Sequence, residues 1–244
     1  MSSDLAEFFV HCGLFVLLSL IGLAVMRGRV NLVWLVIAGA LFLAESAVRT
    51  LGWGRADILD VLPGAAPWEG VLLSLALIIA AAFVLTRARP AEAGFTLAQR
   101  GPAPMLGWAL AVLLVVLATV GALQAAPLGG DVFTGLAFDG VLSPLEAELL
   151  YRGVLLFALD RAFSTPVKLL GAALGWGAVI SAVLYTAAAT SLMSEPGFAM
   201  LVEMQPAAVI LPFAFLLVWI RAATGSVLAP ALVHIWGEAS FRVL

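Results

Sequence analysis

The sequence predicts an all-α polytopic membrane protein with about eight transmembrane helices. Of its 244 residues, 64% are hydrophobic and only 11% are charged, whereas about a quarter of the residues in a soluble domain are charged. The mean hydropathy is +1.14. A helix needs about 20 apolar residues to cross a bilayer. Runs near that length occur at residues 6–26, 31–49, 69–86, 105–126, 135–159, 168–193, 206–222 and 226–243.

The overall charge and the single cysteine exclude several classes of protein. The net charge of −3 argues against a nucleic-acid partner. Cys12 is the only cysteine, so neither an internal disulfide nor a thiolate metal cluster can form within one chain. The polar intervals, of about twenty residues at most, are too short to build a soluble domain.

The first apolar run is interpreted as a retained span. Asp4 and Glu7 precede or open it, where a secretory signal would carry basic residues, and no clear small-residue cleavage site follows.

The basic residues predict the orientation in the membrane, because cytoplasmic loops are enriched in Lys and Arg. They follow the first, third, fifth and seventh predicted helices: Arg27, Arg29, Arg87, Arg89, Arg100, Arg161, Lys168 and Arg221. The alternate loops are poor in basic residues, apart from a mixed loop after the second helix. Both termini are therefore expected outside the cytoplasm. The alanine-rich, lysine-poor composition is typical of GC-rich bacterial coding, which makes the bacterial inner membrane the expected location.

Charged residues inside the fifth run are the first candidates for a functional site. Glu146, Glu148 and Arg152 lie in an otherwise apolar stretch, where each charge costs about 2.5–3.5 kcal/mol on insertion scales. Glu148 and Arg152 are four residues apart and share one helix face. They could form a purely structural ion pair or part of a working site.

Later helices carry features that favour the working site. Tyr185 and Ala189 share a face of the sixth predicted helix, and His234 and Glu238 share a face of the eighth. Together with the Glu–Arg pair they would form a polar cluster at membrane depth. Other patterns have structural explanations. Glu45 and Arg49 predict a local ion pair, and the small residues Gly171 and Gly175 predict close helix packing.

Residues 90–244 resemble the CAAX-protease and bacteriocin-processing family of intramembrane glutamic proteases, which includes the Ras-converting prenyl-protein endopeptidases. Pro144 to Gly153 resembles the first family motif, Glu-Glu-x-x-x-Arg with an upstream proline and a following glycine. Tyr185 fits the start of the second motif, an aromatic residue followed four positions later by His. His234 fits the start of the third motif, which ends in Asn or Asp. The segment Gly94-Phe95-Thr96-Leu97 also looks like one that many members carry.

This resemblance implies a division of the chain. Residues 1–89 would form three N-terminal transmembrane helices, and residues 90–244 the protease-like core of helices four to eight, within one integrated domain.

The departures from the family pattern concern the residues that activate water. Ala147 stands where the family has its first glutamate, the catalytic base, and Ala189 stands where it has the histidine that holds the water. Glu238 replaces Asn or Asp. Glu146 and Glu148 do not obviously take over the role of position 147, because one helical step rotates a side chain by about 100° and each neighbour points away from that face.

The resemblance implies a role for each remaining position. Glu148 would pair with Arg152, and His234, oriented by Glu238, would stabilise the oxyanion. With alanine at 147 and 189 we expect a folded chain that has no proteolytic activity, by engineering or as a natural pseudoprotease.

The expected substrates are membrane-anchored proteins or peptides in the lipid bilayer, and no cofactor or metal is expected. Position 147 falls in the outer half of its predicted helix and position 189 near the outer end of its own, which favours trimming of the C-terminal tails of exported proteins. Alternatives are a prenyl-CAAX endopeptidase, a pseudoprotease that binds a membrane partner, and a small transporter. A transporter is disfavoured because the two halves show no convincing repeat. A zinc protease is disfavoured because His-Glu-x-x-His is absent and only two histidines exist.

Overall fold

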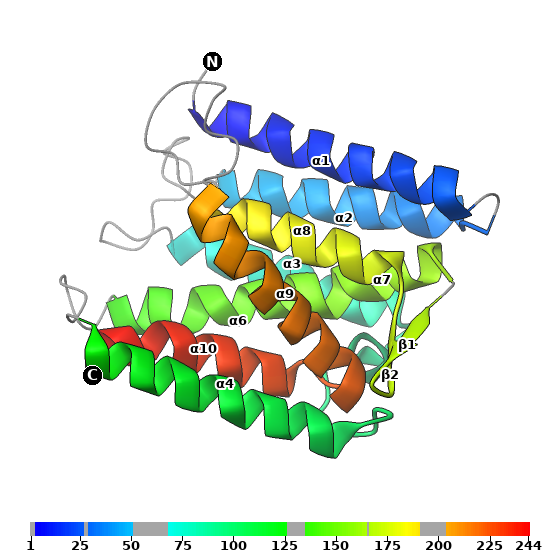
Figure 1. Ribbon diagram of the computed structural model, residues 1–244. Coiled ribbons are helices and arrows are strands. Elements are labelled where there is room, and N and C mark those ends of the chain that lie inside the picture. Colours follow the sequence, from blue (N-terminus) through cyan, green and yellow to red (C-terminus); the bar gives the residue numbers. More distant parts are fainter. Residues whose placement is uncertain (1–2, 27–28, 51–67, 126–134, 165, 191–203) are drawn as a thin grey trace.

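A computed structural model describes residues 3–26, 29–50, 68–125, 135–164, 166–190 and 204–244 (Figure 1). Within these residues the chain forms eight helices and one short β-hairpin, which confirms the all-α polytopic fold. Five of the helices are long and apolar enough to cross a membrane, in the ranges Phe8–Met26, Leu32–Arg49, Trp68–Leu85, Pro104–Gln124 and Ala207–Thr224.

The helices match the predicted runs closely, with one exception. The first four are α1 (Ser3–Met26), α2 (Leu32–Thr50), α3 (Trp68–Leu85) and α4 (Pro104–Gln124). The fifth is a continuous helix made of η3 (Gly135–Leu142), α6 (Ser143–Glu148), η4 (Leu149–Val154) and α7 (Leu155–Ala162), in which η3 and η4 are π-helical. The last three are α8 (Trp176–Thr190), α9 (Met204–Thr224) and α10 (Leu228–Val243).

The exception is the start of the sixth predicted helix. Residues 167–174 form an antiparallel hairpin of β1 (Val167–Leu169) and β2 (Ala172–Leu174). Leu170 and Gly171 at its tip have φ angles of 50° and 88°, as tight two-residue hairpin turns require. The prediction that Gly171 and Gly175 mediate helix packing is therefore wrong, because a left-handed Gly171 ends any helix there. Trp219 of α9 anchors the hairpin by donating its indole N–H to the Leu169 carbonyl, at 2.9 Å.

The fifth helix is the centre of the bundle. It lies between α10 on one side and α2, α3 and α8 on the other, with α4 packed against the outer side of α10 (Figure 1). All residues from Leu150 to Leu159 are buried, as expected of a helix surrounded by other helices. Any charged group on this segment must therefore find its partner inside the protein.

The segment between α3 and α4 is fastened to the end of α9. Gly101 and Ala103 donate their backbone N–H groups to the carbonyls of Thr224 and Ala223, at 2.9 and 3.0 Å. Nearer its start, Phe95 lies against Gly153, where an added Cβ would be 2.7 Å from the ring. The Gly94–Leu97 segment noted in the sequence thus contacts the central helix at Gly153, the residue after Arg152.

This attachment leads to a first prediction. A Cβ at position 101 would lie 2.2 Å from the Ala223 carbonyl oxygen, a backbone atom that cannot swing away. We expect Gly101→Ala to lower the free energy of unfolding by about 1–3 kcal/mol, as overpacking does. Thermal unfolding in detergent measures the effect. Gly13→Ala, whose Cβ would have no neighbour within 4 Å, is the matched control. Equal melting temperatures for the two variants would contradict the described attachment.

Candidate functional site

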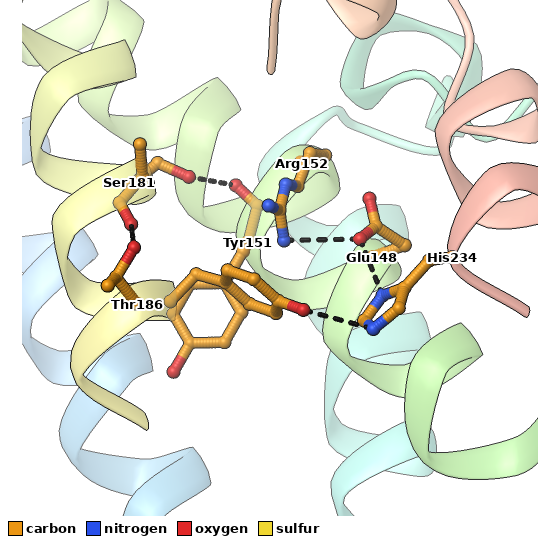
Figure 2. A network of polar contacts seen from close by, with 8 residues as sticks. Glu148, Tyr151, Arg152, Ser181, Thr186 and His234 are labelled. Carbon is orange, nitrogen blue, oxygen red and sulfur yellow. Dashed lines mark hydrogen bonds and ion pairs between the residues drawn. The ribbon is translucent and has the colours of Figure 1, made fainter. Parts of the chain in front are cut away.

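Glu148 is at the centre of a buried polar cluster. Its Oε1 atom lies 3.2 Å from Nη1 of Arg152 and 2.9 Å from Nδ1 of His234 (Figure 2). The side chains of Glu148 and Arg152 have no exposed surface. The Glu148–Arg152 pair predicted from the spacing of four is thus present. The contact of Glu148 with His234 joins the central helix to α10.

The hydrogen bonds define the tautomer of His234. Its Nε2 atom lies 3.0 Å from the Tyr185 hydroxyl. A carboxylate paired with arginine only accepts hydrogen bonds, so Nδ1 carries the hydrogen and donates it to Glu148. In the neutral ring Nε2 is then an acceptor, and the Tyr185 hydroxyl donates to it.

Tyr185 and Arg152 close the cluster into a ring of four side chains. The Arg152 guanidinium carbon lies 4.0 Å from the centre of the Tyr185 ring, a favourable cation–π distance. Within the described part of the chain, none of the three guanidinium nitrogens makes a hydrogen bond of good geometry. Buried donors usually find an acceptor, so Arg152 retains the capacity to bind a further polar group at this site.

The two alanine positions lie at the same level of the bundle, next to this cluster. The Tyr151 and Tyr185 rings meet at 5.6 Å, and Ser181 donates to the Tyr151 carbonyl at 2.6 Å, which fixes the antiparallel register of the central helix and α8. Ala147 lies one turn before Tyr151 in the central helix, and Ala189 lies one turn after Tyr185 in α8. Because the two helices are antiparallel, both alanines lie on the same side of the tyrosine pair. Both alanines pack against the same hydrophobic cluster.

Glu238 does not make the contact that the sequence suggested. Its side chain is exposed, and the two ring nitrogens of His234 contact Glu148 and Tyr185 instead. The orienting contact to His234 therefore comes from Glu148. Sequence spacing could not reveal it, because it joins residues 86 positions apart.

A second buried cluster surrounds Glu146, on another side of the central helix. Glu146 accepts a hydrogen bond from Ser74 of α3 at 2.5 Å, and lies 3.5 Å from Nη1 of Arg49 on α2. Arg49 also pairs with Glu45 at 3.8 Å, as the sequence predicted. Glu146 thus points away from Glu148 and His234. Ser74 carried no recognisable signal in the sequence.

Two features of the surroundings complete the description. Tyr151 and Arg152 lie in the π-helical segment η4, and such segments are frequent at functional sites. Among the described residues, no three His, Cys, Asp or Glu side chains gather in a way that could hold a metal ion.

The apolar helices indicate an integral membrane protein. The ionic and aromatic cluster buried among them forms an internal polar site. Residues 129–239 match the model of a family described as type II CAAX prenyl endopeptidase, Rce1-like. This match confirms the family resemblance found in the sequence, and the family is one of membrane proteases. No curated protein and no solved structure matches the chain. The matched segment contains the whole Glu148 cluster and both alanine positions.

The cluster predicts unequal effects for two glutamates. Glu148→Ala leaves the buried Arg152 without its acidic partner, and removing one member of a buried ion pair costs about 3–5 kcal/mol. Glu238→Ala removes an exposed side chain and should change stability by less than about 0.5 kcal/mol. Chemical unfolding in mild detergent measures both. Similar losses for the two variants would contradict the predicted difference between the buried Glu148 and the exposed Glu238.

Proposed function

We propose that this chain has the scaffold of an intramembrane endopeptidase for membrane-anchored proteins or peptides, and that with Ala147 and Ala189 it does not hydrolyse them. The observation that carries the proposal is the position of these alanines. They lie level with each other beside an intact Glu148–His234–Tyr185–Arg152 cluster. The framework is present, and the two positions that the family resemblance assigns to water activation have only methyl groups.

Peptide hydrolysis requires a water molecule, a base that takes its proton, and donors for the oxyanion that develops. By resemblance, a glutamate at 147 would be the base and a histidine at 189 would hold the water. In an active site of this kind, the buried guanidinium of Arg152 would support the developing charge. In the described arrangement Nε2 of His234 accepts a hydrogen bond from the Tyr185 hydroxyl. This nitrogen can donate to an oxyanion only if the ring takes up a proton. Glu148, on its Nδ1 side, would stabilise the protonated ring.

The expected loss of activity is large. General acid–base catalysis typically contributes 10²–10⁴-fold, and alanine can neither accept a proton nor hold a water. We expect substrate binding to persist, because the contacts of the Glu148 cluster are intact. A natural pseudoprotease that holds a membrane partner is the second candidate, favoured by the intact ion pair and hydrogen bonds of the cluster.

Restoring the two residues tests this proposal. We expect Ala147→Glu with Ala189→His to raise cleavage by at least about 10²-fold over the parent chain. The substrates are exported proteins with a C-terminal membrane tail and, separately, a prenylated CAAX peptide, and the one that is cut identifies the substrate class. Adding His234→Ala to the restored chain should lower the rate by about 10²–10³-fold. A restored chain that binds but never cleaves would favour the pseudoprotease.

The depth of the site bears on the choice of substrate. Ala147 is slightly nearer the Gly135 end than the Ala162 end of the central helix, and Ala189 lies one residue before the described end of α8 at Thr190. These positions agree with the sequence expectation, but the membrane face they approach depends on the proposed orientation, so both substrate classes belong in the assay.

We further propose that both termini lie outside the cytoplasm of a bacterial inner membrane. The carboxyl ends of α1, α3, α7 and α9, where the basic residues concentrate, share the end of the bundle opposite both termini (Figure 1). Cysteine labelling in a Cys12→Ser background tests this orientation. Lys168→Cys in the exposed hairpin should react with a membrane-impermeant maleimide only from the cytoplasmic side, and Leu244→Cys only from the opposite side. The reverse pattern would invert the topology.

We propose that the boundary at residue 90 marks where the family resemblance begins, and that it does not separate two independently folding domains. Trp176 of α8 donates to the Leu18 carbonyl of α1 at 2.9 Å, and α2 and α3 pack directly on the central helix. The N-terminal helices thus belong to one integrated domain with the core.

A further inference from the structure

A polar cavity at the basic end of the bundle is separate from the Glu148 cluster. It has a volume of about 340 Å³ and lies where α2, α3 and α7 meet the start of the α3–α4 connection. Its walls are formed by Trp34, Leu85, Thr86, Arg87, Arg89, Glu92 and Arg161. Nothing in the proposed proteolytic mechanism uses this cavity.

The charges on the walls favour an anion. Three arginines face one glutamate, and Arg161 pairs with Glu92 at 3.0 Å. Arg161 is further held against the Phe157 ring, 3.6 Å from its centre. Among the described residues, Arg87 and Arg89 have no acidic partner, so the cavity retains about two uncompensated positive charges. A phosphate ester matches this charge, and guanidinium groups bind phosphate oxygens with two parallel hydrogen bonds.

The backbone holds the two unpaired arginines at the cavity in a strained turn. Arg87 and the following Ala88 have φ angles of 52° and 63°, a region that side chains with a Cβ rarely adopt. Such conformations persist where the surroundings impose them, and they concentrate at functional sites. Thr86 secures the turn by accepting from the Arg89 backbone N–H at 3.1 Å.

The neighbourhood of the cavity identifies the source of the phosphate. Val33 and Val84, next to Trp34 and Leu85 in the chain, are 68% and 74% exposed, as expected of side chains that face lipid tails. Trp34 is the kind of residue that concentrates at the membrane–water interface. A phosphate in the cavity would therefore lie at headgroup depth, with acyl chains along α2 and α3.

We propose that this cavity is a binding site for the phosphate of an anionic phospholipid headgroup, with Arg87 and Arg89 as its main ligands. Basic pockets between transmembrane helices on the cytoplasmic side suit anionic headgroups. The ligand would fasten the α3–α4 connection, which carries Phe95 and Gly101, to the membrane surface.

Native mass spectrometry of the purified full chain in detergent tests the site. The probes are dioleoyl phosphatidylglycerol, dioleoyl phosphatidylcholine and inorganic phosphate. We expect preferential retention of phosphatidylglycerol, and a roughly tenfold or larger loss of its affinity in Arg87→Gln/Arg89→Gln. Arg29→Gln/Arg100→Gln removes the same charge from positions that do not line the cavity but lie at the same end, and it should change affinity by less than about twofold. Arg87→Lys/Arg89→Lys, which keeps the charge, should retain most of the binding.

Three outcomes would overturn the proposal. The first is equal retention of the two lipids by the parent chain. The second is equal loss of phosphatidylglycerol in the Arg87/Arg89 and Arg29/Arg100 glutamine variants. The third is displacement of the lipid by inorganic phosphate at similar concentration, which would indicate a small-anion site.

Discussion

Burial of the Glu148 carboxylate is the constraint on which the rest of the core depends. A charge without exposed surface inside an apolar bundle is tolerated only when it is paired and hydrogen-bonded. Arg152 supplies the opposite charge from the same helix, and His234 supplies a hydrogen bond from α10. Tyr185 extends the chain of contacts to α8. The positions of three helices are thus tied to one carboxylate oxygen, and the same contacts that hold the bundle together also align the candidate site.

The central helix can hold two buried acidic clusters because its different faces contact different helices. Glu148 faces α10, while Glu146 faces Ser74 and Arg49 on α3 and α2. Gly153 leaves room for Phe95 from the α3–α4 connection. Two acidic clusters centred on residues two positions apart, about 200° around the helix, can therefore coexist without sharing partners. This separation also explains why Glu146 does not replace the missing base at position 147.

Local patterns in the sequence predicted the helices and the Glu148–Arg152 pair, since both follow from spacing along one helix. The contact of His234 with Glu148 depends on the packing of two helices, which no spacing encodes, and Glu238 was the nearest candidate within the same helix. The hairpin at 167–174 was missed for another reason. An apolar run does not distinguish strand from helix, and Leu170 gives no warning that it adopts a left-handed conformation next to Gly171.

The hairpin has a consequence for the bilayer itself. Within the described residues it leaves α8 with 15 residues, and α10 has 16, so these described helices are only about 22–24 Å long at 1.5 Å per residue. The hydrocarbon layer is about 30 Å thick, and short segments are accommodated by local thinning. The helices that carry Tyr185 and His234 are therefore the ones around which the membrane should be thinnest. Bulk water would then lie closer to the buried cluster than its depth in an undisturbed bilayer suggests, which suits a scaffold whose relatives consume water.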